Sequence, residues 1–233
     1  MKPNSDKPPG YEAKPADYFE LAREEMLAFL PPHCRRVLDV GCSKGNFGKL
    51  LKQTRNLEVW GVEPVAAAAA EAATKLDRVI EGVFNAETDL PPESFDAIFF
   101  NDVLEHLFDP AAALRHARTL LKPDGVIIAS IPNFRHFQTL WKIAVLGEWR
   151  YQDCGILDAT HLRFFTRKSI LELFAETQFT IQKLEGLKPF FSMHPSYTQV
   201  WKIYRLFGWL PVTRIQEMRF LQFAVVAGKQ NAK

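Results

Sequence analysis

The chain of 233 residues is long enough for one elaborated domain or two small ones, and 29 basic against 27 acidic side chains give a net charge of +2. That balance argues against a dedicated nucleic-acid binder, which needs a clustered basic surface, and a hydrophobic content of 47% argues against a largely disordered chain. The three cysteines form no C-x-x-C pair, which disfavours a disulfide framework or a structural zinc site and favours the reducing cytoplasm.

Hydrophobic periodicity divides the first 131 residues into alternating helices and strands. Residues 1–17 are expected to form a flexible tail, and an amphipathic helix is predicted over 18–30, where two prolines end it. The predicted strands are 36–40, 57–62, 78–84, 95–100 and 125–131, and the predicted helices are 47–53, 65–76 and 110–121. This alternation favours an α/β fold with a parallel sheet, whose ligand binds at the carboxyl ends of the strands.

The alternation breaks after residue 133. The remaining prediction is an irregular aromatic segment over 134–165, a helix over 166–177, a strand over 179–187, a second aromatic segment over 188–217 and a final strand over 218–227. Aromatic faces suit sugars, ring compounds and lipid tails, so both aromatic segments are candidate acceptor-binding insertions. Core packing or a dimer interface is the alternative. Basic and aromatic residues also mix over 201–209, as in a helix that makes peripheral contact with a membrane. No run of about 18 apolar residues predicts a membrane span.

A glycine-rich loop follows the first predicted strand and opens a helix. Gly41, Gly45 and Gly48 let the backbone turn sharply and approach a ligand, and the helix start offers unpaired N–H groups. Their spacing, G-x-x-x-G-x-x-G, differs from the dinucleotide pattern and so disfavours an NAD-dependent reductase. Asp39 would attract an ammonium group, and Glu63, after the second strand, would accept ribose hydroxyls. S-adenosylmethionine carries both groups, and a plain turn with a surface acid is the alternative.

Four motifs occur in one order along the chain: VLDVGCSKGNFG, VWGVEP, SFDAIFFNDVLEHLFDP and LLKPDGVIIASIPN. In order and spacing they resemble the class I S-adenosylmethionine-dependent methyltransferases, over nearly all of residues 18–187. The segment GEWRYQDCGILDATHLRFFTRKSI is similar to bacterial members associated with glycosyltransferases and surface-polysaccharide assembly. The resemblance implies a single domain over 18–233. It implies a Rossmann-like seven-strand sheet with the last strand antiparallel, helices on both faces, and aromatic lid insertions at 134–165 and 188–217.

The resemblance also implies a role for each residue of the cofactor site. The methionine part would lie against Asp39, Gly41, Gly45, Asn101 and Asp102 with Cys42 as a small space-filler, the ribose against Glu63 and Pro64, and the adenine against Asn85 and Ala86. Relatives carry Asp at position 85, and the Asn85 oxygen can still accept from the adenine amino group. Tyr18 and Arg23 would lie in an N-terminal segment that covers the cofactor. An ordinary amphipathic helix packed on the sheet is the alternative for these two.

Two histidines are candidate catalytic bases for removing a proton from an acceptor hydroxyl. His106 follows the fourth predicted strand, and a packing role in the next turn is its alternative. His161 lies between Asp158, which could orient its ring, and Arg163, which could hold an anionic acceptor or pair with Asp158; a loop-stapling hydrogen-bond network is the alternative. Apart from Glu105 beside His106, no His, Asp and Glu cluster has ligand spacing, so no metal site is predicted.

The function predicted from these features is methyl transfer from S-adenosylmethionine to a small-molecule or glycan-type acceptor at oxygen. The product of the cofactor would be S-adenosylhomocysteine. A non-catalytic methyltransferase-like binding protein is the alternative. The acidic pair and the glycine loop speak against loss of the cofactor site, and they do not by themselves establish turnover.

Overall fold

The computed structural model describes residues 22–189 and 216–230 of the chain. The predicted tail 1–17, Tyr18 at the start of the predicted helix, and most of the aromatic segment 188–217, including the mixed basic and aromatic stretch 201–209, lie outside the described residues. In the part of the chain that is described, no helix is both long enough and apolar enough to cross a membrane.

Strands and helices alternate through the first two thirds of the chain. The strands are β1 (Arg36–Val40), β2 (Glu58–Glu63), β3 (Arg78–Glu81), β4 (Phe95–Asn101), β5 (Leu121–Pro132), β6 (Phe179–Pro189) and β7 (Phe220–Lys229). The α-helices are α1 (Asn46–Thr54), α2 (Ala66–Ala72), α3 (Pro110–Leu120), α4 (Phe137–Ala144) and α5 (Arg167–Glu176). Short 3₁₀ helices are η3 (Glu24–Phe29), η4 (Leu104–His106) and η6 (Glu217–Arg219).

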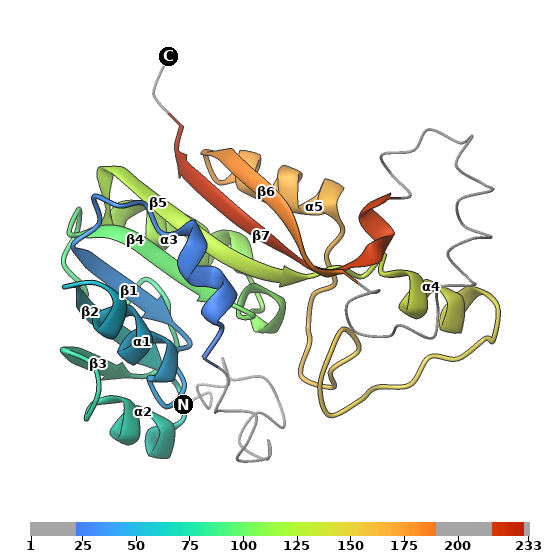
Figure 1. Ribbon diagram of the computed structural model, residues 1–233, viewed down its shortest axis with the longest axis horizontal. Coiled ribbons are helices and arrows are strands. Elements are labelled where there is room, and N and C mark those ends of the chain that lie inside the picture. The colour runs from blue at the N-terminus through green and yellow to red at the C-terminus, as the bar shows by residue number, and fades with distance from the viewer. Residues whose placement is uncertain (1–21, 190–215, 231–233) are drawn as a thin grey trace.

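The strands form one sheet in the order β3-β2-β1-β4-β5-β7-β6 (Figure 1). β1 to β5 pair in parallel, and β7 is antiparallel to both of its neighbours, β5 and β6. This confirms the Rossmann-like seven-strand sheet with its last strand antiparallel. The strand order reverses at β1, so the carboxyl ends of β1 and β4 flank the switch point at which open α/β sheets bind their ligands.

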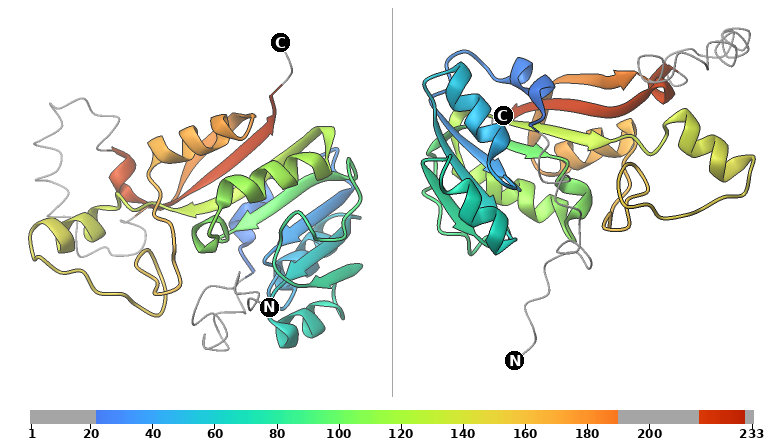
Figure 2. Two further views of the ribbon diagram at one scale, coloured as in Figure 1. Left: turned by 180° about the vertical axis from the view of Figure 1, so that it is seen from behind. Right: turned by 60° about the horizontal axis from the view of Figure 1, so that its bottom comes forward.

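Buried side chains alternate along the central strands and divide the core between the two faces of the sheet. Leu38 and Ile98 belong to a cluster with apolar residues of α3 and α5. Val37 and Phe99, their neighbours in sequence, belong to a second cluster with residues of η3 and α1. Figures 1 and 2 show these helices on opposite sides of the sheet, as the resemblance implied.

The described part of the N-terminal segment differs from the α-helix predicted over 18–30. It is the 3₁₀ helix η3, and Arg23 just before it has a φ of 47°. A non-glycine residue in this left-handed region does not continue a right-handed α-helix. The helix prediction is therefore wrong from residue 23 onward, because the chain turns there.

Two predicted elements end early, and the second of them leaves a loop at the ligand edge of the sheet. α2 ends at Ala72 rather than at residue 76, because the N–H groups of Thr74 and Lys75 bond to carbonyls three residues earlier at 3.1 and 2.9 Å, which tightens the last turn. β3 ends at Glu81 rather than at residue 84, and Gly82 follows with a φ of 148°. Residues 82–86 therefore form a loop beside the strand ends.

α4 lies inside a segment predicted to be irregular. The side chain of Asn133, just before it, donates to the carbonyls of Glu217 and Phe220 at 2.9 Å each, which anchors the segment to η6 and β7. Trp141 on α4 is 49% exposed. The apolar residues Phe137, Leu140, Trp141 and Ala144 do recur at helical spacing, so the sequence contained a helix signal that the prediction missed. In Figures 1 and 2 the helix projects beyond the end of the sheet.

Candidate active site

Two glycines shape the loop between β1 and α1. Gly41 and Gly45 have φ values of 70° and 75°, which glycine adopts readily and other residues do not. A Cβ on Gly41 would lie 2.8 Å from Cγ2 of Val103, and one on Gly45 would lie 3.0 Å from the backbone of α2. The N–H groups of Gly41 and Cys42 donate to the Val62 carbonyl at 2.8 and 3.1 Å. The loop is thereby held against β2 with no side chain between its backbone and the neighbouring groups.

Two buried carboxylates lie at the ends of the adjacent strands β1 and β2. Asp39 is 2% exposed and Glu63 is 0% exposed. Glu63 accepts the N–H of Ser43 at 2.9 Å and the N–H of Val65 at 3.0 Å, which holds its carboxylate next to the glycine loop. Burial, together with the nearby negative charge of Glu63, raises the pKa of Asp39 to about 8. Such a concentration of acid suits a ligand that brings a positive charge.

The raised pKa of Asp39 predicts a pH-dependent stability. The folded protein holds a proton that the unfolded chain releases near pH 4, so stability falls as pH rises from about 4 to about 8, by up to ~1.4 kcal/mol per pH unit. Asp39→Asn removes this dependence. We expect the Tm of the ligand-free variant to fall less than that of the wild type over this window, measured by thermal melts followed by circular dichroism. Asp124→Asn, at an exposed position of β5, should follow the wild-type curve. Parallel curves for wild type and Asp39→Asn would contradict the buried acid.

A groove opens beside the glycine loop at the carboxyl ends of the strands. Its first part has a cavity volume of about 50 Å³, and its lining includes Val40, Gly41, Val62, Pro64, Asp102, Val103 and His106. A second part of about 210 Å³ shares Val83, Phe84 and Leu107 with the first and reaches Asn85 and Ala86. The groove therefore runs from the glycine loop to the residues expected at the adenine.

Asn101, the last residue of β4, carries an unsatisfied side chain. Its Nδ2 and Oδ1 are both buried and have no hydrogen-bond partner among the described residues. Leaving a buried polar group unpaired costs about 1–3 kcal/mol. A group of this kind beside a groove marks a place where a ligand can complete the hydrogen bonds.

Asp102 joins three distant parts of the chain at the wall of the groove. It has a φ of 55°, and its Oδ2 lies 2.8 Å from Nη1 of Arg23. Its Oδ1 accepts from Nε2 of Gln222 at 2.8 Å and from Oγ of Ser130 at 3.0 Å. Gln222 accepts in turn from Nη2 of Arg23 at 3.1 Å. The network thus connects the N-terminal segment with β4, β5 and β7, and it places Arg23 against a groove-lining residue.

His106, His161 and Glu105 form a buried group next to this wall, with exposures of 5%, 8% and 1%. The two imidazole rings meet edge to face, with centroids 4.7 Å apart. Nδ1 of His106 lies 3.1 Å from the Thr160 carbonyl, and Nδ1 of His161 lies 3.0 Å from the Ile156 carbonyl. A carbonyl only accepts, so in each neutral ring Nδ1 carries the proton and Nε2 the lone pair. His106 lines the groove, whereas His161 packs against the ring of His106.

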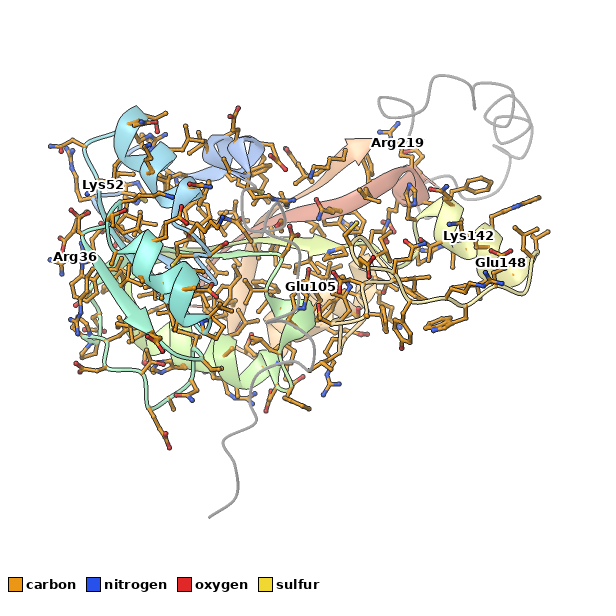
Figure 3. The ribbon with its side chains drawn as sticks, turned by 90° about the horizontal axis from the view of Figure 1, so that it is seen from below. Arg36, Lys52, Glu105, Lys142, Glu148 and Arg219 are labelled. Atoms are coloured by element: carbon orange, nitrogen blue, oxygen red, sulfur yellow. The ribbon has the colours of Figure 1, made fainter. Side chains whose placement is uncertain are left out.

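Glu105 lies in the interior of the molecule, where Figure 3 shows it far from Lys142 and Glu148 on the projecting segment. Burial, with Asp102 nearby as the next cause, raises the pKa of Glu105 well above its usual range. Its Oε1 is 3.9 Å from Nε2 of His161. Burial thus favours the protonated form of this carboxyl beside the histidines.

Glu105, His106 and His161 are also the group of described residues closest to a metal-binding arrangement, since their ligand atoms lie within 4.8 Å of one another. Ligands about 2.1 Å from a tetrahedral zinc ion are about 3.4 Å apart. The separation of 3.9 Å between His161 and Glu105 is wider than that. The ligand atoms of these three side chains are therefore farther apart than those of a formed zinc centre.

The predicted partners of His161 and Arg163 are placed differently by the structure. The tautomer of His161 is set by the Ile156 carbonyl rather than by Asp158, whose carboxylate accepts two hydrogen bonds from Thr160. Arg163 donates to the carbonyls of Leu162 and Phe108, which ties the loop down instead of pairing with Asp158. Neighbours in sequence suggested pairs that the loop's turns do not form.

Two residues expected at the cofactor are also engaged in local structure. Oδ1 of Asn85 accepts the N–H of Glu87 at 2.8 Å, so this oxygen caps its own turn. Cys42 packs where a Cβ on Gly61 would lie 2.5 Å from its sulfur, in agreement with a space-filling role. Burial, with Asp39 and Glu63 nearby, raises the pKa of the Cys42 thiol, so the thiol stays protonated and is a poor nucleophile.

The sequence interpretation missed several residues that build the site. Gln222 was a detectable one, because a polar side chain interrupts the apolar strand MRFLQFAVVA. Val103 and Ser130 had no distinguishing pattern. Lys75 donates from its Nζ to the carbonyl of Lys44 at 2.7 Å and to Asn46, which fastens the glycine loop to the end of α2. Side-chain contacts between residues about 30 positions apart in the sequence cannot be predicted from residue spacing.

Comparison with known proteins assigns the fold and the family. A family described as a methyltransferase domain matches residues 15–184. A SAM-dependent methyltransferase from Archaeoglobus fulgidus aligns with a TM-score of 0.67 at 19% identity, covering 91% of this chain and 94% of that one. The 1,6-didemethyltoxoflavin-N1-methyltransferase of Burkholderia thailandensis, solved with S-adenosylhomocysteine, aligns with a TM-score of 0.57 at 19% identity, covering 91% and 80%. At such identities the structural likeness concerns the fold alone.

Curated sequence relatives cover a smaller part of the chain. The ubiquinone biosynthesis O-methyltransferase of Yersinia enterocolitica is 36% identical over 120 residues, which are 48% of this chain and 48% of the relative. That of Histophilus somni is 32% identical over 123 residues, 48% and 50% of the two chains. This chain thus spans about half the length of the curated relatives it matches. Because the family match covers most of its length, the chain belongs to the methyltransferase-domain family.

Proposed function

We propose that this protein is an S-adenosylmethionine-dependent methyltransferase that acts on an oxygen of a small-molecule acceptor. The observation that carries the proposal is the pair of buried acids, Asp39 and Glu63, at adjacent strand ends beside a glycine loop and an open groove. With its pKa raised to about 8, Asp39 is largely protonated at neutral pH in the ligand-free protein. A ligand that brings an ammonium group and a sulfonium would favour the ionised form of Asp39, and Glu63 offers carboxylate acceptors to a ribose diol.

The residues present fit this cofactor in three respects. Gly41 leaves space that a Cβ would fill. The side-chain amide of Asn101 is buried and has no hydrogen-bond partner among the described residues. The second part of the groove reaches Asn85. Asp39 and Asn101 would hold the methionine end, and Glu63 the ribose. When bound, the cofactor supplies a methyl group on a positively charged sulfur. The protein positions that group, excludes water and removes the proton of the acceptor.

His106 is the residue that we assign to the proton transfer. It lines the groove with Asp102, and its Nε2 carries the lone pair because Nδ1 donates to the Thr160 carbonyl. With the cofactor bound, Nε2 of His106, which is buried in the structure, would take up the proton of an acceptor hydroxyl. His161 packs against this ring and supports its orientation. We therefore assign His161 to support and His106 to the base.

Oxygen as the methylated atom is supported by the names of the curated relatives, which are O-methyltransferases of ubiquinone biosynthesis. Phe134, Trp149 and Phe164 form an aromatic wall outside the groove lining, with ring centroids 5.1 to 5.9 Å apart, and Phe164 meets the ring of His161 with centroids 6.4 Å apart. Trp149 is 47% exposed, so one face of this wall can stack on a ring. Both a saccharide and a hydroxylated aromatic compound offer a hydroxyl on such a ring.

The proposal is tested with methyl-labelled S-adenosylmethionine and a panel of hydroxylated acceptors, including catechols and saccharides. We expect label transfer to at least one hydroxyl compound and none to its O-methylated analogue. Transfer only to amines would contradict the assignment to oxygen. Tight S-adenosylhomocysteine binding with no transfer to any class would favour a non-catalytic binding protein.

A further inference from the structure

We propose that Asp158 and Thr160 are positioning residues that hold His106 as a base, an inference that rests on the role assigned to His106 above. Asp158 is 1% exposed, and its Oδ1 accepts the N–H of Thr160 at 2.8 Å and the hydroxyl of Thr160 at 2.7 Å. The same hydroxyl oxygen lies 3.2 Å from Nδ1 of His106. A buried acid thus reaches the imidazole through one hydroxyl group.

The direction of these hydrogen bonds follows from the number of protons. The Thr160 hydroxyl has one proton, which it donates to Asp158, so it offers only a lone pair to His106. The carbonyl of Thr160, 3.1 Å from the same nitrogen, is also an acceptor. Nδ1 of His106 therefore faces two acceptors and must carry the ring proton. The lone pair is left on Nε2, the nitrogen that the proposed reaction uses.

The loop that carries these residues is bound directly to the segment that carries the base. The N–H groups of Leu162 and Arg163 donate to the Glu105 carbonyl at 2.9 and 3.0 Å. Within the loop, the N–H of His161 donates to the Asp158 carbonyl at 3.0 Å. The spacing between Thr160 and the ring of His106 is thereby held by backbone bonds on both sides.

A negative charge on Asp158 would stabilise the protonated form of His106. When His106 takes up a proton it becomes a cation in a buried site, which is costly unless a negative charge compensates it. The other ionisable groups around the ring are His161, Glu105, whose ionisation is opposed by burial, and Asp102, which is already paired with Arg23. Asp158, linked through the Thr160 hydroxyl, supplies compensation that does not depend on the groove's contents.

The test follows the His106 ring by long-range ¹H–¹⁵N NMR in the full chain, with ¹⁵N-labelled histidine and the His106 signals assigned through His106→Gln. We expect the Nδ1–H tautomer in the wild type. Asp158→Asn and Thr160→Val should each lower the pH at which the ring takes up its second proton, by roughly 0.5 to 1. The double variant should shift no further than either single variant, because Asp158 acts through Thr160. Thr160→Ser should restore the wild-type value, and Asp153→Asn, exposed in the same loop, should not change it.

An Nε2–H tautomer in the wild type, additive shifts in the double variant, or an unchanged midpoint in Thr160→Val would overturn the proposal. If Asp158→Asn does not fold, the comparison of Thr160→Val with Thr160→Ser decides the matter. These NMR readouts need no acceptor. Failure of methyl transfer with the NMR result intact would therefore count against the proposed function and not against the positioning role.

Discussion

Replacing His106 by glutamine should lower the turnover of methyl transfer to a hydroxyl acceptor by roughly 10² to 10⁴, the usual contribution of a general base. Glutamine approximates the size of the ring but cannot accept a proton at neutral pH. Affinity for S-adenosylhomocysteine should stay within about threefold of the wild type, because the proton transfer concerns the acceptor. Turnover is measured by label transfer and affinity by calorimetry.

The matched control for this variant is His33→Gln, since His33 is exposed just before β1, at the opposite end of that strand from the groove. It should leave turnover at the wild-type level. If His106→Gln retained turnover while His161→Gln lost it, the base would be His161 and the order of the two rings in the proposal would be reversed. If both variants lost cofactor affinity, the pair would belong to the cofactor site.

Replacing Glu63 by glutamine should weaken binding of S-adenosylhomocysteine by roughly 10- to 150-fold. This corresponds to the loss of about 1.5–3 kcal/mol for a hydrogen bond to a charged group, at about 1.4 kcal/mol for each factor of ten. The two carboxylate oxygens accept from Ser43 and Val65, and glutamine replaces one of these acceptors by a donor. The local loop is weakened as well, so thermal melts accompany the calorimetry.

Glu58→Gln is a suitable control, because Glu58 lies at the other end of β2 and pairs with Arg36 at 2.7 Å. Both variants remove one charge from the same strand, but only Glu63 adjoins the groove. Equal affinities of wild type and Glu63→Gln would show that the acid does not contact the ligand. Equal losses in both variants would indicate a general electrostatic effect.

The sequence predicted best those features that depend on neighbouring residues. β1 has the predicted limits because its apolar run is bounded on both sides, and α3 begins after Asp109, which accepts the N–H of Ala112 at 2.8 Å. Glu63 was identified because it ends an apolar strand at a fixed distance from the glycine loop. In these cases the residues that form the sequence pattern are the same residues that stabilise the local structure.

Features that depend on distant residues were not predictable from one sequence. Arg23 and Gln222 are 199 residues apart in the chain and hydrogen-bonded in the fold. Arg23 adopts a left-handed backbone conformation, which is unfavourable for a residue with a side chain. The ion pair between its guanidinium and Asp102 stabilises this conformation against the helix that local propensity favours. The link between Asp158 and His106 escaped notice for the same reason, since sequence proximity favoured His161 as the partner.

The central claim is that the groove at the ends of β1 and β2 binds the amino-acid end and the ribose of S-adenosylmethionine, which S-adenosylhomocysteine shares, through two buried acids. Calorimetric titration of the full chain with S-adenosylhomocysteine and, separately, with NAD tests it most directly. We predict saturable one-site binding of S-adenosylhomocysteine that is lost in the Asp39→Asn/Glu63→Gln double variant, and no binding heat with NAD. Binding of NAD without S-adenosylhomocysteine, or undiminished binding in the double variant, would contradict the claim.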